Sequence, residues 1–262
     1  MATVAEILNF LNTIAPPYMR EEWDNVGLNC GRMDRHVDKL LIALDPFAEV
    51  CREAVEWGAQ LLVTHHILIQ KPGFLTDQDE QGRNVLLLLE NGIAHINAHT
   101  NLDLAPGGVN DVLASTLGLE DVKVLNPTGT SEDGKPYGLL RAGTVQEQSL
   151  DAFLASVKEK LGCPVLRYTD GGKAVHRVAV GGGSCGSGLY EAAEAGCDTF
   201  VTADIKYNQF WDARNLGLNI IDAGHFYTEN PVCTYLAEKI RKAFPDISVK
   251  ISQKHRDCMK FF

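Results

Sequence analysis

LLIALDPFAEVCREAVEWGAQLLVTHH, residues 40–66, occurs a second time in this chain in related form. It aligns without a gap on residues 178–204, VAVGGGSCGSGLYEAAEAGCDTFVTAD, with six identical positions that include Gly58 and Gly196. Each copy has the pattern of a strand, a turn, a helix that ends at glycine and a second strand, which is typical of a βαβ unit with parallel strands. The repeat therefore predicts an α/β fold with two related halves.

The segment between the two copies marks a boundary. Residues 126–138, NPTGTSEDGKPYG, are polar and rich in Gly and Pro, which predicts a linker. We therefore expect a first α/β repeat over residues 1–125 and a second over residues 139–262.

Two further helices are expected from apolar residues at helical spacing. The first begins near Val4 and stops at Pro16. Because this segment contains the acidic Glu6 and no Lys or Arg, its pattern favours a helix packed on a core over one lying on a membrane surface. The second begins after Ser149 as N-cap. Its apolar side chains are those of Leu150, Phe153, Leu154 and Val157.

The composition limits the possible partners and compartment. The formal net charge of -10 at pH 7 argues against binding to nucleic acid or to an anionic membrane surface. The seven cysteines include no C-x-x-C pair, and the first residues lack the regions of a signal peptide. No apolar stretch is long enough to cross a bilayer. These features predict a cytoplasmic protein.

Histidines and carboxylates follow the predicted strands. His65 and His66 come directly after an apolar run, and residues 91–103, NGIAHINAHTNLD, resemble residues 216–229, LGLNIIDAGHFYTE, when one gap is allowed. Both segments end in a histidine and a carboxylate four residues apart, which share one face of a helix. The two pairs are His99/Asp103 and His225/Glu229. Functional groups in open α/β sheets collect beyond the carboxyl ends of the strands, so we expect these side chains to meet.

These residue types suit a metal centre. Any one of the histidines alone is more often a hydrogen-bonded structural residue than a ligand. As a set, imidazole and carboxylate donors suit Zn, Mn, Fe or Ni, and a dinuclear centre needs about three protein ligands per metal. Because no cysteine is among them, the set favours an open catalytic site over a closed structural zinc site. The predicted ligands are His65, His66, Asp103, His225 and Glu229.

Three motifs, THH, AHTNLDLAPGGVNDVLA and DAGHFYTE, are similar to those of the Nif-three-like family (NGG-interacting-factor type), some members of which are labelled GTP cyclohydrolase I type 2. The stretches EEWDNVGLNCG and GGGSCGSGLYEAAEAGCDTFVTADIKYNQ also match, so the likeness extends over nearly the whole chain. The resemblance implies two intertwined α/β repeats, each with a mixed, mostly parallel sheet flanked by helices, and a dinuclear metal site in the cleft between them. It also implies a ring-shaped homohexamer.

By motif, the family's ligands fall on the same five residues, with Asp103 or Glu229 as a bridging ligand. His99 would be a further ligand or would support the others. Two positions depart from the family pattern. Ile67 follows the paired histidines where the family usually has Pro, and Tyr207-Asn208 stand where it often has His. The middle segment is too short for the extra domain of longer relatives.

The Gly-rich stretch GGGSCGSG, residues 181–188, has two interpretations. Such a turn before a helix can bind an anion through backbone N–H groups, but it lacks the Lys and the spacing of a phosphate-binding loop. A tight turn between strand and helix fits equally well. Cys185 within it would be a nucleophile only with a suitably placed His or Asp, which the sequence spacing does not provide.

Four further residues are candidates for substrate binding. Asp204, Lys206 and Tyr207 follow a predicted strand end, where they would either contact a substrate or form a surface turn. Asp24, in WDNVGL, would either line the cleft or cap a turn.

The leading functional hypothesis is a dinuclear metal-dependent hydrolase with two divalent metal ions per chain and a small-molecule substrate. The cyclohydrolase label of relatives implies a nucleotide ring as the electrophile, and a phosphoester is the other candidate. His99 would serve as the acid or base. The alternative is a metal-binding scaffold that handles metal or binds a protein partner without turnover.

Overall fold

Both copies of the repeated stretch form a strand, a helix and a second, parallel strand in the computed structural model of the chain, which describes residues 2–70 and 73–262. The elements are β4 (Lys39–Ala43), α2 (Ala48–Trp57) and β5 (Leu61–Thr64) in the first copy, and β12 (Val175–Val180), the 3-10 turn η2 (Gly186–Gly188), α7 (Leu189–Glu194) and β13 (Thr199–Thr202) in the second. Gly58 and Gly196 follow the helices with φ of 72° and 75°, a backbone conformation that glycine adopts without steric cost.

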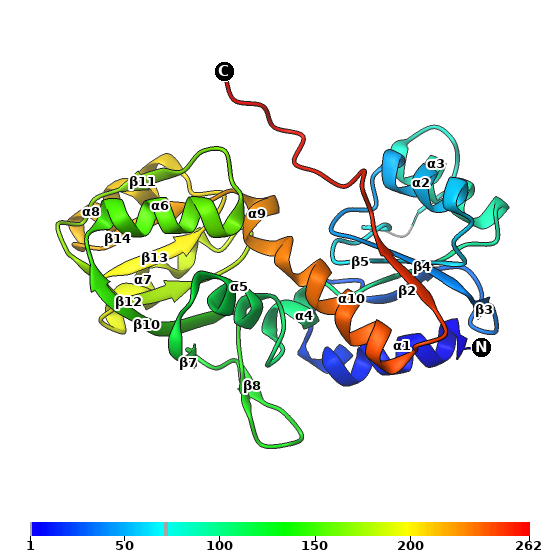
Figure 1. Cartoon of the computed structure of the whole chain (residues 1–262), viewed down its shortest axis with the longest axis horizontal. Coiled ribbons are helices and arrows are strands. Elements are labelled where there is room, and N and C mark those ends of the chain that lie inside the picture. Colours follow the sequence, from blue (N-terminus) through cyan, green and yellow to red (C-terminus); the bar gives the residue numbers. More distant parts are fainter. Residues whose placement is uncertain (1, 71–72) are drawn as a thin grey trace. The chain divides into compact units, whose positions relative to one another are not determined.

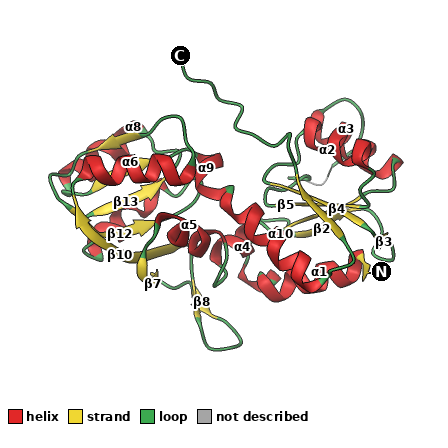
Figure 2. Cartoon of the chain, viewed as in Figure 1, coloured by secondary structure: helices red, strands yellow, loops and turns green. Residues whose placement is uncertain are grey.

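The chain divides into two structural units, and in each of them helices alternate with strands (Figure 2). Unit 1 comprises the residues up to Leu102 together with 233–256, and unit 2 comprises residues 103–232 and 257–262. The chain passes from one unit to the other three times: within α4 (Thr100–Leu104), within α10 (Pro231–Ala243) and between Arg256 and Asp257.

These units differ from the predicted repeats at 1–125 and 139–262. The expected linker, 126–138, contains the short strands β8 (Gly129–Thr130) and β9 (Pro136–Tyr137), which pair with each other inside unit 2. The last strand, β15 (Ser248–Ile251), pairs in parallel with β4 and so belongs to unit 1. Composition could not predict this division because strand pairing between distant segments determines it.

Unit 1 has a five-stranded mixed sheet in the order β15-β4-β5-β6-β2. Its first four strands run parallel and the edge strand β2 runs antiparallel. One core of this unit joins Leu41 and Leu62 of the sheet to Val50 of α2 and Val85 and Leu88 of α3. The remaining elements are β1 (Ala2–Thr3), α1 (Val4–Ile14), η1 (Pro17–Met19), β2 (Gly27–Cys30), β3 (His36–Val37), α3 (Glu80–Glu90) and β6 (Ala94–Asn97).

Unit 2 has a six-stranded mixed sheet in the order β11-β14-β13-β12-β10-β7 (Figure 1). The three strands β12, β13 and β14 run parallel, and β7, β10 and β11 pair antiparallel to their neighbours. The remaining elements are α5 (Val109–Leu117), β7 (Glu120–Leu125), β10 (Leu140–Gln148), α6 (Leu150–Leu161), β11 (Arg167–Thr169), α8 (Tyr207–Asn215), β14 (Asn219–Asp222) and α9 (His225–Glu229).

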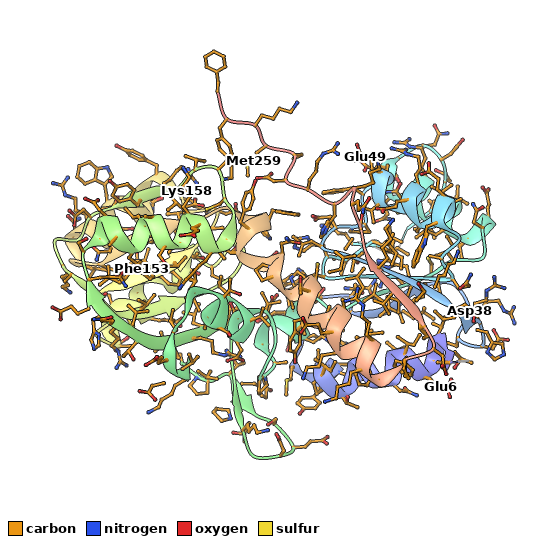
Figure 3. The ribbon with its side chains drawn as sticks, in the orientation of Figure 1. Glu6, Asp38, Glu49, Phe153, Lys158 and Met259 are labelled. Atoms are coloured by element: carbon orange, nitrogen blue, oxygen red, sulfur yellow. The ribbon has the colours of Figure 1, made fainter. Side chains whose placement is uncertain are left out.

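Helices cover both faces of the unit 2 sheet. Val201 packs in one core with Phe153 of α6, whereas its neighbour Phe200 packs in another with Leu189 of α7. Successive side chains of a strand point to opposite faces, so each central strand supplies both cores. On α6 the buried Phe153 and the exposed Lys158 extend from opposite sides of the helix (Figure 3). The predicted mixed α/β fold with flanking helices is confirmed.

Both helices predicted from apolar spacing are also confirmed. Helix α1 begins at a capping box, in which Thr3 Oγ1 accepts a hydrogen bond from the Glu6 backbone N–H and Glu6 accepts one from the Thr3 N–H. Helix α6 begins at Ser149, whose hydroxyl accepts a hydrogen bond from the Ala152 N–H. Among the helices of the described residues, none has the length and apolar character needed to span a membrane.

Candidate metal centre

Three histidines of unit 1 form a cluster beyond the ends of two neighbouring parallel strands. His65 and His66 directly follow β5, and His99 comes two residues after β6. The ring centroids are 4.9 Å apart for His65 and His66, 5.2 Å for His65 and His99, and 5.6 Å for His66 and His99. One nitrogen from each ring lies within 4.8 Å of the other two, so the three imidazoles could hold a metal ion.

Each of these rings is oriented by a hydrogen bond that its Nδ1 donates. His65 Nδ1 lies 2.8 Å from the Ala98 carbonyl oxygen, and His66 Nδ1 lies 2.6 Å from Asp45 Oδ1. A carbonyl or carboxylate partner can only accept, so Nδ1 bears the hydrogen and Nε2 is the nitrogen with which the ring would bind an ion. This is the arrangement that metal-binding histidines commonly show.

His99 is held by Asp24, which is buried. Its Nδ1 lies 3.1 Å from Asp24 Oδ1, while the other carboxylate oxygen accepts hydrogen bonds from the Thr100 backbone N–H and hydroxyl at the start of α4. Burial by itself raises the pKa of Asp24, but the hydrogen bonds from His99 and Thr100 outweigh it and hold the pKa at about 2. Asp24 therefore stays ionised and fixes both His99 and the beginning of α4.

In unit 2, the predicted pair His225 and Glu229 lies within α9, four residues apart. His225 Nε2 is 3.0 Å from Glu229 Oε2, so the two donors point to one place. His225 Nδ1 lies 2.7 Å from Asp204 Oδ2, which orients this ring as Asp45 orients His66. Asp204 itself has a left-handed backbone with φ of 52°, a conformation that is uncommon outside glycine and that Asp and Asn adopt more readily than most residues.

The Gly-rich loop after β12 makes room for Glu229. A Cβ atom at Gly183, whose φ is 63°, would lie 3.0 Å from both the Glu229 carboxyl carbon and His225 Nε2, and closer still to Glu229 Oε1. The backbone N–H of Gly182 donates to Asn110 Oδ1, and that of Gly183 donates to Thr228 Oγ1. The loop therefore helps to position the metal-binding candidates of unit 2. Because both N–H groups already donate within the protein, they are not free to bind an anion, and the anion-binding interpretation is not supported at these two residues.

Asp103 lies on α4 and is buried in unit 2. Asn110 donates a hydrogen bond to its carbonyl oxygen, and the buried Arg141 donates to the carbonyl oxygens of Leu104 and Ala105. Arg141 is in turn paired with Asp111, at 2.9 Å. The backbone that holds Asp103 is thus anchored to the same loop and sheet that support Glu229.

Cys185 lies in this loop as a buried thiol. Burial, followed by the negative charges of Asp103 and Glu229, raises its pKa far above the ordinary value. Its Sγ donates to the Gly182 carbonyl oxygen. A thiol that does not ionise is a poor nucleophile, so the structural interpretation of Cys185 is favoured.

The chain matches the family model for Duf34/NIF3 (NGG1p interacting factor 3) over residues 2–257. It belongs to this family. A Clostridium perfringens protein named GTP cyclohydrolase 1 type 2 homolog is 34% identical over 262 residues, which cover 98% of each chain. The crystal structure of a Staphylococcus aureus hypothetical protein, SA1388, has a TM-score of 0.91 at 29% identity and covers 99% of both chains. That of a Bacillus cereus protein related to NIF3 has a TM-score of 0.90 at 27% identity and covers 100% of this chain and 99% of the other.

The remaining candidates of this NIF3-family protein lie in different surroundings. Lys206 precedes α8, where its backbone N–H donates to Gln209. Tyr207 begins α8, is 79% exposed and lines a pocket with the aromatic residues of that helix. Neither residue contacts a predicted ligand in unit 2 through a hydrogen bond or an ion pair among the residues described.

Sequence reasoning missed two positioning residues. Asp45 immediately follows Leu44 at the end of the first strand of the repeat, so the rule that directed attention to His65 also applied to it. Asn110 lies within the motif AHTNLDLAPGGVNDVLA, but nothing in its spacing indicated a link to the Gly-rich loop.

Asp45→Asn is expected to weaken metal binding without unfolding this NIF3-family protein. The amide keeps the size of the carboxylate but removes the charge that fixes His66, and loss of such a partner typically lowers metal affinity by roughly 10- to 100-fold. Competition against a chromophoric chelator measures the affinity. Asp38→Asn, an exposed acidic residue of the same unit, is the control and should leave the affinity unchanged. An Asp45→Asn protein with wild-type affinity would refute the role of Asp45.

Proposed function

We propose that this protein is a metal-dependent hydrolase with two divalent metal ions per chain. The observation that best supports the proposal is that His65, His66 and His225 each have Nδ1 fixed by an oxygen acceptor, which leaves Nε2 as the nitrogen that would bind an ion. The donors that would hold the ions are His65, His66, Asp103, His225 and Glu229.

The chemistry of this donor set fits such ions. All donors are imidazole or carboxylate, which suit Zn, Mn, Fe or Ni, and no thiolate closes the site. Bound ions of this kind supply Lewis-acid activation of water and of an electrophilic carbon or phosphorus atom. His99, whose Nδ1 donates a hydrogen bond to the ionised Asp24, would hold or move a proton close to the imidazoles of His65 and His66.

A groove in unit 1 would bind the substrate. It has a volume of about 520 Å³ and lies beside His66 and His99. Two exposed aromatic side chains, Trp23 and Phe47, line it, and the amide side chains of Gln81 and Asn84 supply polar groups. Aromatic walls with a few polar groups suit a planar ring. Because relatives bear the name GTP cyclohydrolase 1 type 2 homolog, we propose a nucleotide ring as the first substrate class and a phosphoester as the second.

The test combines metal content with turnover. Protein purified without chelator should contain close to two transition-metal ions per chain, whereas His66→Ala and Glu229→Gln should each lose metal and hydrolysis together. His36→Ala removes an exposed histidine of unit 1 and should retain both. Hydrolysis is measured on a panel of purine nucleotides, phosphomonoesters and phosphodiesters with the metal-loaded protein.

Two outcomes would contradict the proposal. Wild-type protein that binds no ion after exposure to Mn, Fe, Zn and Ni would exclude the metal centre. Full metal occupancy without turnover on any of these substrates would instead support a role in metal handling or partner binding. In that case, Glu229→Gln should leave the affinity for a protein partner unchanged.

A further inference from the structure

A second pocket lies in unit 2, between the edge strand β11 and helix α8. Its volume is about 660 Å³, which is within the range of small-molecule sites. All of the residues that line it belong to unit 2, and none is a proposed metal ligand. The side chains that matter most are Arg167 and Tyr168 of β11 and Tyr207, Phe210, Trp211 and Arg214 of α8.

The sequence of α8 places these side chains on one face. Phe210, Trp211 and Arg214 follow Tyr207 by three, four and seven residues, so the four side chains lie along one face of the helix. Ala213 is buried toward the sheet. Tyr207 is 79% exposed and Trp211 is 48% exposed. Large aromatic side chains that stay exposed together on a helix face commonly mark a binding surface.

Both arginines of the pocket lie over aromatic rings. The guanidinium carbon of Arg167 is 5.6 Å from the Phe210 centroid, and that of Arg214 is 5.5 Å from the Trp211 centroid. Arg167 is also paired with the buried Asp222, which fixes its position. Among the described residues, no carboxylate forms an ion pair with Arg214. In a chain of net charge -10, the pocket therefore presents a guanidinium whose charge is not neutralised by an ion pair.

We infer that this pocket binds a planar heteroaromatic ring that bears a phosphate, such as a nucleoside monophosphate. The rings of Tyr168, Tyr207 and Trp211 offer faces for stacking, and Arg214 offers the planar fork of donors that suits phosphate. The carboxylate of Asp170, which also lines the pocket, would accept a hydrogen bond from an N–H group on the ring. The inference is independent of the proposed metal centre.

Isothermal titration calorimetry with three ligands tests both parts of the ligand. AMP contains ring and phosphate, adenosine lacks the phosphate, and ribose 5-phosphate lacks the ring. We expect this pocket to bind one AMP per chain, separately from any nucleotide in the unit 1 groove, and to bind each of the other two ligands roughly tenfold or more weakly. Arg214→Gln should weaken AMP to the level of adenosine, and Trp211→Leu should weaken both AMP and adenosine.

Matched variants separate this site from the metal centre. Lys158→Gln removes one exposed positive charge from α6 of the same unit and should bind AMP as the wild type does. Glu229→Gln should also bind AMP normally, even though it is expected to lose metal. AMP binding that disappears in Glu229→Gln but persists in Arg214→Gln would place the ligand at the metal centre and refute the inference. Absence of AMP binding by the wild type at millimolar concentration would also refute the inference. So would self-association of the protein through this pocket, which would be recognised by its loss in Trp211→Leu.

Discussion

Gly183→Ala is expected to weaken metal binding strongly while leaving the protein folded. The added methyl group would lie 3.0 Å from the Glu229 carboxyl carbon and from His225 Nε2, so the carboxylate would have to leave its present position. We expect metal affinity to fall by roughly 100-fold, as for loss of a group that fixes a ligand. Metal titration of the apoprotein, with circular dichroism as a check on folding, measures the effect.

Gly162→Ala is the matched control for backbone strain. Gly162 has a φ of 66°, close to the 63° of Gly183, but apart from its two chain neighbours no part of the described chain lies within 4 Å of a Cβ atom placed there. This variant should lose about 1 kcal/mol of stability, because a residue with a Cβ atom is disfavoured at positive φ, and it should keep wild-type metal affinity. If the two variants lost affinity equally, strain alone would explain the result and the role of Gly183 in making room for Glu229 would be wrong.

Arg141→Met is expected to destabilise unit 2 by about 3–5 kcal/mol. Arg141 is 1% exposed and donates hydrogen bonds to the carbonyl oxygens of Gly138, Leu104 and Ala105 as well as to Asp111. Methionine fills much of the same volume but donates no hydrogen bond, so these buried acceptors would lose their partner. Amide hydrogen exchange resolved along the chain should show faster exchange in β7 and β10 than in the strands of unit 1.

The control for this prediction is Arg177→Met, on the neighbouring strand β12, where the arginine is exposed. Its stability should stay within about 0.5 kcal/mol of the wild type, as is usual for a surface substitution. Because Arg141 also bonds the backbone that follows Asp103, Arg141→Met should lower metal affinity as well. A stable Arg141→Met protein with protected β7 and β10 would show that the buried hydrogen bonds contribute little.

Local pattern was enough to predict many of the elements and the residues at their ends. Apolar spacing identified α1 and α6, and the aligned copies identified two strand–helix–strand units whose strands pair in parallel. Functional side chains collect beyond the carboxyl ends of parallel strands, and this rule predicted that His65, His66 and His99 lie close together. They do form a cluster in unit 1. These successes share one cause, because each depends on residues close in the sequence or on a strand end that the repeat defines.

The partners of the donors could not be predicted in the same way. His66 is held by a residue 21 positions away, and His99 by one 75 positions away. The Gly183 N–H bonds to a hydroxyl 45 positions further on. Such pairs have no period in the sequence, so no spacing rule finds them. The pocket beside α8 was missed for a similar reason, since it also needs the edge strand β11, which has no helical or repeat signal.

By itself, the sequence determined the mixed α/β class, the βαβ units and the candidate donors, since each follows from hydrophobic period, turn residues or residue type at a strand end. Tertiary structure alone decided which carboxylate orients each imidazole, why Gly183 has no side chain and where the chain divides into units. Hydrogen bonds and close contacts act over a few ångströms in space between residues that the fold brings together. Their partners are therefore a property of the folded chain.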